Sequence, residues 1–502
     1  MKTIVIALLA CIFACFKAQE TVQGAGVALH VRQEFFDNIK DSVLREFVES
    51  IEIGKVNDIH FKKDIGAFNQ TLFSIALNMT NIELHNFKMD LDTSFLKLNE
   101  QNPHLELFIS NLSTVATFDF NFFSEPSFIS DVGKGYFNLE PTSLYLGYTV
   151  DSSSGRPIFI ADKAIMNSTD LTFVLNGTAD FSKLIFQVSS YLKIFIKDKV
   201  NDYFTAIIGA TVSPIINNSI SSYYRLTYNL TEDIIVNFTS TVPPQFTEDD
   251  MTVFFKGEAR PIDSEIPFSS QLQVPSEVNT KGRQLQVGIS DYLLNTTIYS
   301  LYKKDYLQVD TKNINGTSYE TEASYLFYVF PKLAEKLQPT DLVSFRAVAK
   351  STNYYPYMEI VGGVTTAYIE FDIEMINKNE TLLKMDYNVE AKADVNIVQG
   401  FKLTVDIQTL KFNLIEITEN NIDPTIDERD INAFIGFISG FARNYVNQFV
   451  RNFEVPLPFG DNISLKDVSL IEKDSFIYAD VTPIINILKP SPESGKFSEL
   501  TQ

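Results

Sequence analysis

The sequence predicts an α+β protein of two elongated barrels, each a rolled, strongly twisted antiparallel sheet closed by a long helix. Three observations support this fold. Apolar residues recur at helical spacing in a few separate segments, and apolar and polar residues alternate over long strands between them. The order helix, strands, helix also occurs twice along the 502 residues. Solenoid repeats have periods of about 20–50 residues, so this is a duplication of a whole fold.

Two helices are predicted in the first half. The first covers residues 31–51, where apolar residues from Val31 to Ile51 recur every four positions and charged residues fill the opposite face. The second covers residues 181–224, and Pro214 is expected to kink or break it. A helix of that length must lie along something extended, such as a sheet of long strands.

Strands are predicted between these helices, over residues 52–178, because apolar side chains alternate with polar or small ones. Turn signals divide the strands at Glu125-Pro126, at Gly133-Lys134-Gly135 and at Ser154-Gly155-Arg156-Pro157. We expect a hairpin turn at each of them.

The second half repeats this order after a stretch rich in proline and acidic residues at 240–280. Short helices are predicted over Asp291–Lys304 and Tyr325–Leu337. A final helix is predicted at 431–449, followed by a last strand that ends at Val481.

One long strand stands out in this half. Apolar residues alternate without a break from Leu383 to Ile397, which at about 3.4 Å per residue spans about 50 Å. The alternation continues from Phe401 and slips by one position at Gln408-Thr409, which predicts a β-bulge there.

The first residues form a targeting segment. Lys2 precedes an apolar run from Ile4 to Phe16, which is too short to span a bilayer and ends in small residues near Ala18. We expect secretion and cleavage near this point. The chain's two cysteines, Cys11 and Cys15, lie in the segment, so the mature protein is expected to contain no disulfide.

Sequons for N-glycosylation are spread over the chain, as expected for a secreted glycoprotein. The candidate acceptors are Asn69, Asn78, Asn111, Asn167, Asn176, Asn217, Asn229, Asn237, Asn295, Asn315, Asn379 and Asn462.

Charge and motifs exclude several classes of function. The 41 basic against 63 acidic residues give a net charge of -22, which disfavours a nucleic-acid partner or a strongly anionic membrane. The four histidines lack the spacing of a zinc site, and no Gly-x-Ser-x-Gly motif of an acyl hydrolase is present. We therefore expect no catalytic residues, no metal and no cofactor other than a bound lipid.

Six segments, in this order and spacing, carry a resemblance that covers residues 24–482. They are Gly26-Val27-Ala28-Leu29-His30-Val31, Ser154-Gly155-Arg156-Pro157, Lys256-Gly257-Glu258, Gly288-Ile289-Ser290-Asp291-Tyr292-Leu293-Leu294-Asn295-Thr296, Phe330-Pro331-Lys332-Leu333-Ala334-Glu335-Lys336 and Phe453-Glu454-Val455-Pro456-Leu457-Pro458. The chain thus resembles the family of bactericidal/permeability-increasing protein, lipopolysaccharide-binding protein and the plasma lipid transfer proteins.

The resemblance implies two tubular lipid-binding barrels joined end to end as a boomerang. The implied organisation is a signal peptide at 1–18, a first barrel at 19–240, a linker with central-sheet strands at 241–280, a second barrel at 281–482 and a flexible tail at 483–502.

Each barrel would hold one phospholipid or other acyl lipid, with its chains inside an apolar channel. The candidate lining residues are Val31, Phe35, Ile39, Val43, Leu184, Val188, Leu192, Leu383, Met385, Tyr387 and Val389.

Two departures from the family pattern matter. The family's disulfide in the first barrel would fall near Ala161 and Val212, and neither is a cysteine. The basic loop of antibacterial members corresponds to 119–126, which contains no cation. Its aromatic residues would instead enter a lipid interface. The candidates for this membrane contact are Phe120, Phe122 and Phe123.

The predicted function is therefore that of a secreted, extracellular, monomeric lipid-binding or lipid-transfer protein that acts without catalysis. Its partners would be an acyl lipid and, transiently, a membrane or lipid-particle surface. The alternative is a protein of innate immunity that recognises microbial glycolipid such as lipopolysaccharide.

Overall fold

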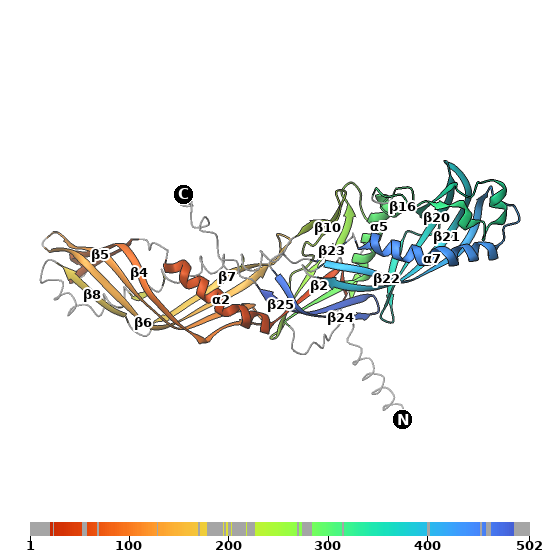
Figure 1. Ribbon diagram of the computed structural model, residues 1–502. Coiled ribbons are helices and arrows are strands. Elements are labelled where there is room, and N and C mark those ends of the chain that lie inside the picture. The colour runs from red at the N-terminus through yellow and green to blue at the C-terminus, as the bar shows by residue number, and fades with distance from the viewer. Residues whose placement is uncertain are drawn as a thin grey trace, which may run out of the picture. The chain divides into compact units, whose positions relative to one another are not determined.

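The computed structural model describes residues 21–23, 25–52, 58–67, 70–127, 129–168, 171–177, 194, 197–198, 202, 217, 226–268, 271–273, 284–313, 316–398, 402–451, 454–457 and 463–485 (Figure 1). The predicted signal peptide, nearly all of the predicted helix at 181–224 and residues 486–502 lie outside these ranges. No helix in the described ranges is both long and apolar enough to cross a membrane.

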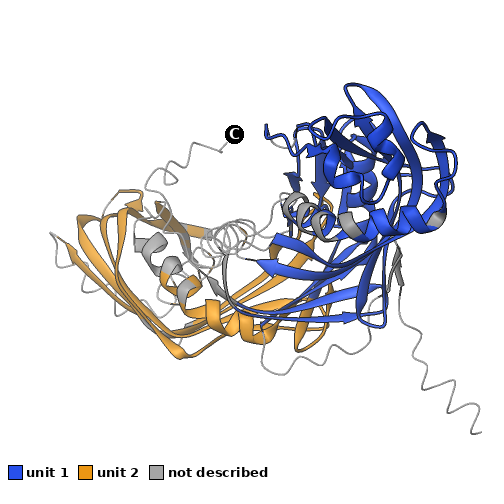
Figure 2. Ribbon diagram, turned by 45° about the vertical axis from the view of Figure 1, so that its right-hand side comes forward, with its two compact units in different colours: residues 1–30, 223–242, 252–502 blue, residues 31–222, 243–251 orange. Residues whose placement is uncertain are grey.

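The chain divides into two compact units, which Figure 2 colours separately. Unit 1 comprises residues 1–30, 223–242 and 252–502, and unit 2 comprises 31–222 and 243–251. Residues before position 31 therefore belong with the second half of the chain.

Unit 2 is built on one antiparallel sheet with the strand order β3-β4-β5-β6-β7, and β8 pairs with β6. The strands are β3 (Ile59–Ala67), β4 (Gln70–Leu98), β5 (Leu105–Glu125), β6 (Ser130–Asp151), β7 (Ile158–Ser168) and β8 (Leu171–Gly177). Alternate residues of β5 are buried along its whole length, which is why strands can be this long here.

The helix α2 (Gln33–Glu52) lies against β4 in unit 2 (Figure 1). Its apolar residues from Phe35 to Leu44 are buried, including Phe36 and Leu44, as the four-residue spacing predicts. The helix begins later than expected, because Val31 belongs to the strand β2 (Val27–Arg32).

The predicted hairpin turn at Gly133-Lys134-Gly135 is wrong. These residues lie within β6, where Gly133 and Gly135 pair with β5 on one side and β8 on the other. A Cβ on Gly133 would lie 2.2 Å from the backbone oxygen of Asn176, and one on Gly135 would lie 2.5 Å from the Phe118 ring. Glycine therefore permits close packing here. The turns at Glu125-Pro126 and after Asp151 are found as predicted.

Unit 1 contains a large antiparallel sheet with the order β16-β18-β20-β21-β22-β23, to which β17 and β19 add at the sides. Its strands are β16 (Gln308–Asp310), β17 (Thr321–Glu322), β18 (Leu342–Lys350), β19 (Tyr357–Val361), β20 (Val364–Asn377), β21 (Glu380–Val398), β22 (Lys402–Asn420) and β23 (Val455–Pro456).

A second sheet has the order β11-β12-β2-β15-β25-β24, and smaller sheets join β13-β10-β9 and β1-β14. Their strands are β1 (Thr21–Gln23), β9 (Thr227–Asn229), β10 (Ile234–Asn237), β11 (Gln245–Phe246), β12 (Asp250–Phe255), β13 (Glu258–Pro261), β14 (Gln271–Gln273), β15 (Leu285–Ser290), β24 (Ile463–Lys473) and β25 (Phe476–Ile485). The stretch 240–280 thus contains buried strands, and β25 extends into the first residues of the predicted tail.

The long strand and its bulge are confirmed in unit 1. Seven alternate residues of β21, from Leu383 to Val395, are buried. Lys392 pairs with Thr409 and Ala393 pairs with Ile407, so Gln408 is the additional residue of a bulge.

The helices of unit 1 are α5 (Asp291–Lys303), α6 (Ala323–Leu326), the 3₁₀ helix η1 (Pro331–Glu335) and α7 (Glu428–Val450). The helices α5 and α7 are confirmed. The single helix expected over Tyr325–Leu337 is wrong, because Pro331 has no amide hydrogen to continue the first segment and begins a separate 3₁₀ turn.

Candidate functional site

The inward face of the large sheet in unit 1 is an unbroken apolar surface. Met385 of β21 pairs with Ile373 of β20 and Ile417 of β22, and Tyr387 pairs with Phe371 and Leu414 in the same way. Directly paired residues point to one face of a sheet, so these strands together present one apolar layer. All four candidate residues of this strand, Leu383, Met385, Tyr387 and Val389, belong to that layer.

The size of the side chains changes along this layer. Leu383, Met385 and Tyr387 occupy one end of the buried row of β21, Ala391 and Ala393 follow, and Val395 is its last buried residue. The neighbouring β20 is also small at this level, since Ala367 pairs with Ala391. The layer is therefore least bulky where Ala391 and Ala393 lie.

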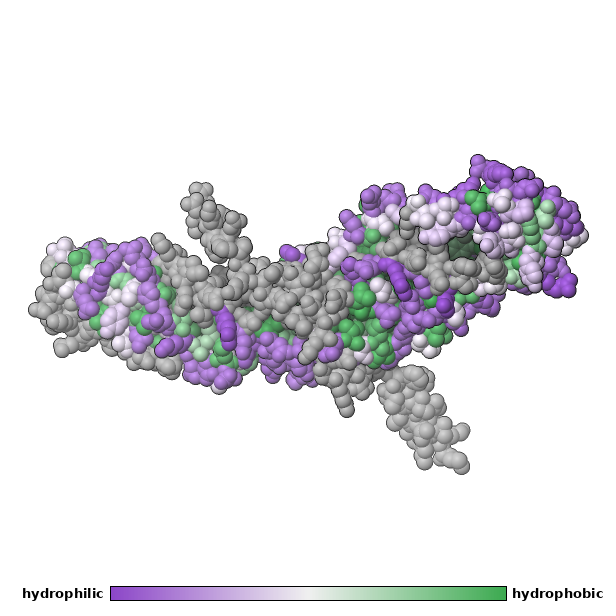
Figure 3. All heavy atoms as spheres, viewed as in Figure 1, coloured by the Kyte–Doolittle hydropathy of each residue, from purple (hydrophilic) through white to green (hydrophobic). Residues whose placement is uncertain are grey.

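Three helices cover the bulky end of the layer. Phe434 of α7 is fully buried and packs its ring 5.5 Å from that of Phe330 and 5.6 Å from that of Phe345. Leu326 of α6 and Leu333 of η1 are also fully buried in the same cluster. Figure 3 shows a recess with apolar atoms at its base beside α7, framed by polar atoms of the described surface.

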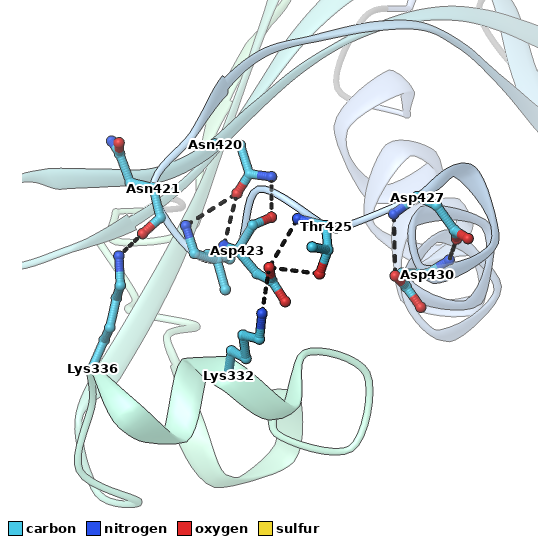
Figure 4. A network of polar contacts seen from close by, with 9 residues as sticks. Lys332, Lys336, Asn420, Asn421, Asp423, Thr425, Asp427 and Asp430 are labelled. Carbon is cyan, nitrogen blue, oxygen red and sulfur yellow. Dashed lines mark hydrogen bonds and ion pairs between the residues drawn. The ribbon is translucent and has the colours of Figure 1, made fainter.

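A polar network fixes the connection between β22 and α7 at this end (Figure 4). Lys332 of η1 donates to Asp423 over 2.8 Å, and Lys336 donates to the carbonyl oxygen of Asn421. Thr425 donates to the same Asp423 oxygen from its amide and its hydroxyl, at 2.8 and 2.7 Å. These hydrogen bonds hold the pKa of Asp423 at about 2, so the carboxylate is charged over the whole physiological range.

Two aspartates then start α7. The Asp427 carboxylate accepts from the amide of Asp430 over 3.2 Å, and the Asp430 carboxylate accepts from the amide of Asp427 over 3.2 Å. This reciprocal pair is a capping box, which sets where the helix begins and therefore which of its residues face the apolar layer.

The opposite face of this sheet is polar. Lys350 pairs with Asp372 over 2.8 Å and also with Asp386, and Lys384 pairs with Glu374 over 3.0 Å. Burial raises the pKa of Asp386, and the adjacent ammonium group of Lys350 compensates the cost of its charge. The sheet is thus apolar only on the side that the helices cover.

Unit 2 presents a comparable inward face with larger side chains. Leu105, Leu107, Ile109 and Leu112 of β5 are fully buried, and the rings of Phe118 and Phe173 stack 5.5 Å apart. Thr114, Ala116 and Ser124 are the small residues in this row of β5.

The candidate residues of α2 lie on this side of unit 2. Phe35, Ile39 and Val43 are buried, and so is Val31, which is on β2. The candidates Leu184, Val188 and Leu192 lie outside the described residues.

The expectation that the Phe-rich stretch is an exposed loop is wrong. Phe120 and Phe122 lie in β5 and are 4% and 2% exposed, because both belong to its inward row. They pair with Met79 and Leu77 of β4. Phe123 points to the other face and is half-buried. Two of the three membrane-contact candidates are therefore core residues.

Side-chain amides attach helices to the edges of the sheets in both units. In unit 2, Gln33 of α2 donates to the Leu96 oxygen at 2.7 Å and accepts from the Leu98 amide at 2.8 Å. In unit 1, Asn447 of α7 accepts from the Ile407 amide at 2.6 Å and donates to the Ile407 oxygen at 2.9 Å. Each amide satisfies two backbone groups that no strand pairs with.

Asn217 and Asn295 make the same type of contact. Asn217 binds both backbone groups of Phe159 in β7, and Asn295 of α5 binds both backbone groups of Met358 in β19. We call these four residues amide clamps. The sequence does not predict these contacts, because each amide lies at least 40 positions from its partner. The only local indication of a clamp is an amide residue within a helical segment.

The described residues contain no group of three or more histidine, cysteine, aspartate or glutamate side chains that could hold a metal ion.

Comparisons with solved structures gave distant similarities. The crystal structure of lipopolysaccharide binding protein matches with a TM-score of 0.49 and 16% identity, covering 92% of this chain and 99% of that one. P47 of Clostridium botulinum E1 matches with a TM-score of 0.26 and 10% identity, covering 92% of this chain and all of that one. Takeout 1 of Epiphyas postvittana matches with a TM-score of 0.24 and 15% identity, covering 38% of this chain and 88% of that one.

No curated protein sequence matches the chain. A sequence model of the C-terminal domain of the LBP / BPI / CETP family matches residues 229–482, which is half of the chain. The matched residues include the whole large sheet of unit 1 with α5 and α7. The chain therefore belongs to the LBP / BPI / CETP family.

Proposed function

We propose that the protein is a secreted glycoprotein that binds acyl lipids between the sheet and the helices of each unit and exchanges them with a membrane or lipid-particle surface. The observation that carries this proposal is the apolar layer of unit 1, in a chain of the LBP / BPI / CETP family. Large side chains fill its helix-covered end, and we expect an acyl chain to lie where the side chains are small, beside Ala391 and Ala393.

Apolar burial is sufficient as a driving force. Each CH₂ group that leaves water contributes about 0.8 kcal/mol, so an acyl chain of ordinary length binds tightly without any ionic contact. Release then requires an acceptor surface that is equally apolar. This favours transfer between membranes over release into water.

Native mass spectrometry of protein secreted by a eukaryotic host, followed by lipid extraction, tests the proposal. We expect a mass excess that corresponds to one or two acyl lipids. Bare protein whose mass does not change after incubation with mixed phospholipid vesicles would contradict it.

Two adjacent residues of β21 provide a matched test in unit 1. Ala391 is buried in the apolar layer, and Lys392 is exposed on the opposite face. We expect Ala391→Phe to occupy the space proposed for the acyl chain and reduce lipid uptake, and Lys392→Phe to leave uptake unchanged. Ala391→Leu is a smaller step in the same direction if the phenylalanine variant folds poorly.

The corresponding pair in unit 2 is Ala116 and Thr117 of β5. Ala116 is fully buried in the inward row, and Thr117 is exposed. If both units bind lipid, Ala116→Phe and Ala391→Phe each remove one lipid equivalent, and the double variant removes both. Thr117→Phe is the control.

Recognition of a microbial glycolipid is the second candidate, because the family includes proteins named for binding lipopolysaccharide. The net charge of -22 argues against an anionic glycolipid. At the end of β5 the ammonium group of Lys62 is already paired with Glu125, at 2.5 Å. Saturable binding to lipopolysaccharide that is lost at moderate salt would favour this alternative.

A further inference from the structure

We propose that two of the sequon asparagines, Asn217 and Asn295, are amide clamps that carry no glycan. We assign the glycans of the described chain to the exposed sequons at Asn111, Asn167, Asn176, Asn229 and Asn379. The inference rests on the secretory route in the proposed function and adds which of its modification sites are used.

The clamp at Asn295 joins α5 to the edge strand β19. Its Nδ2 donates to the Met358 oxygen at 2.8 Å, and its Oδ1 accepts from the Met358 amide at 2.6 Å. The neighbours Leu294 and Thr296 are buried, and Met358 is buried as well. The amide therefore fills a confined space between helix and strand.

The clamp at Asn217 has the same geometry. The Phe159 amide donates to Oδ1 at 2.7 Å, and Nδ2 donates to the Phe159 oxygen at 2.7 Å. Phe159 is fully buried on β7. Sequons thus coincide with clamps once in each unit.

A glycan and a two-bond clamp compete for the same position on the amide. To bind both groups of one residue, the amide must use the hydrogen that lies on the same side as Oδ1. A secondary amide is planar and trans, which places the carbon attached to nitrogen on that side of the C–N bond. The first sugar would therefore replace the hydrogen that binds Met358 or Phe159.

The remaining two clamps support a structural role. Asn447 binds both backbone groups of Ile407, Gln33 bridges the Leu96 oxygen and the Leu98 amide of β4, and neither residue lies in a sequon. An amide is thus used to attach a helix to a sheet edge whether or not the sequence around it can be glycosylated.

The exposed sequons offer a different environment. Asn379 lies in the turn between β20 and β21 with φ +71°, and Asn111 lies in β5 with φ +51°. Asn229 is exposed at the end of β9. A glycan at these positions extends into solvent.

Peptide mapping of the secreted protein tests the assignment. Enzymatic release of N-glycans in heavy-oxygen water marks each used asparagine by its mass. We expect marks at the exposed sequons and unmarked Asn217 and Asn295. A glycan on either clamp in folded, secreted protein would overturn the inference, and so would the absence of glycan from every exposed sequon.

Two variants separate the clamp from the sequon. Asn295→Asp keeps the acceptor for the Met358 amide and places a second oxygen against the Met358 carbonyl, so we expect a Tm lower by several degrees and an unchanged glycan mass. Asn229→Asp is the matched control, with one glycan lost and the Tm unchanged. The reverse pattern, glycan loss with an unchanged Tm for Asn295→Asp, would refute the clamp.

The lipid content of the same sample keeps the two proposals apart. Bare protein with the expected glycan pattern contradicts lipid binding and leaves the clamp assignment supported. If Asn295→Asp is not secreted, the wild-type map still decides the assignment.

Discussion

The inward faces of unit 2 and unit 1 differ in how the size of their side chains is distributed. Along β5 of unit 2 the small buried residues Thr114, Ala116 and Ser124 are separated by bulky ones such as Phe118 and Phe122. Along β21 of unit 1 two small residues, Ala391 and Ala393, follow each other in the buried row. The same alternation therefore scatters the small side chains in one unit and groups them in the other.

This difference teaches that periodicity alone does not specify what a sheet can hold. Both rows satisfy the pattern of a half-buried strand, yet the space above each depends on side-chain volume. We expect unit 1 to accept a ligand beside Ala391 and Ala393, and unit 2 to require displacement of side chains around Ala116.

The largest effect is expected from truncation of the aromatic cluster in unit 1. Phe434→Ala removes a fully buried ring and should destabilise unit 1 by about 3–5 kcal/mol. Hydrogen exchange should show faster opening of α7 and β18 with β3–β8 unchanged. Phe118→Ala removes a ring from unit 2, so we expect faster exchange in β3–β8 and unchanged exchange in α7 and β18. An equal increase of exchange in both units after either substitution would contradict the expectation that each unit opens separately.

A close approach between strands should give the next effect. Gly133→Ala places a methyl group against the Asn176 backbone, and such overpacking costs about 1–3 kcal/mol. Gly436→Ala is the control in unit 1, because Gly436 lies in α7 with no atom within 4 Å of the added Cβ. It should stabilise the helix by about 0.5–1 kcal/mol. Denaturant unfolding of both variants should therefore shift in opposite directions.

Loss of the α7 clamp should cost less. Asn447→Ala leaves the amide and carbonyl groups of Ile407 without their partner, and two such hydrogen bonds contribute about 1–3 kcal/mol. The Ile407 amide should then exchange faster. Asn413→Ala, at an exposed position of the same β22, should leave that rate unchanged.

The smallest effect is expected from lowering the pH, which changes the stability of unit 1 through Asp423. The folded pKa of Asp423 is about 2, below the ordinary value of 3.8. Its contribution to stability is therefore complete above pH 3.8 and is lost as the pH falls through about 2. Asp423→Asn should flatten the dependence of unit 1 stability on pH in this window. An unchanged slope in denaturant unfolding would show that the Lys332 contact is not coupled to folding.

Much of the fold could be predicted where one local period dominates. The bulge at Gln408 was predicted because alternation slips by one residue, and α5 and α7 because their stripes are regular. Predictions failed where a tertiary partner decides the conformation. The sequence around Gly133 predicts a turn, because its place in a strand depends on pairing with β8, which begins more than 35 residues later.

The candidate site was predicted in part for the same reason. The row from Leu383 to Val389 could be predicted because the sheet follows the period of the strand. The surface position of Phe120 and Phe122 is implied by the resemblance to a loop of the family, although their own alternation indicates the core. The contacts of Lys332 with Asp423 and of Asn447 with Ile407 join residues far apart in sequence, so no local pattern contains them.

The amide clamps have a consequence for association between molecules. An open strand edge offers unpaired backbone groups to a strand of another chain, which is how β proteins aggregate. At Phe159, Met358 and Ile407 both groups are already bound by an amide of the same chain, and so are the Leu96 oxygen and the Leu98 amide. The backbone groups that a clamp binds are thus unavailable for pairing with a strand of another molecule.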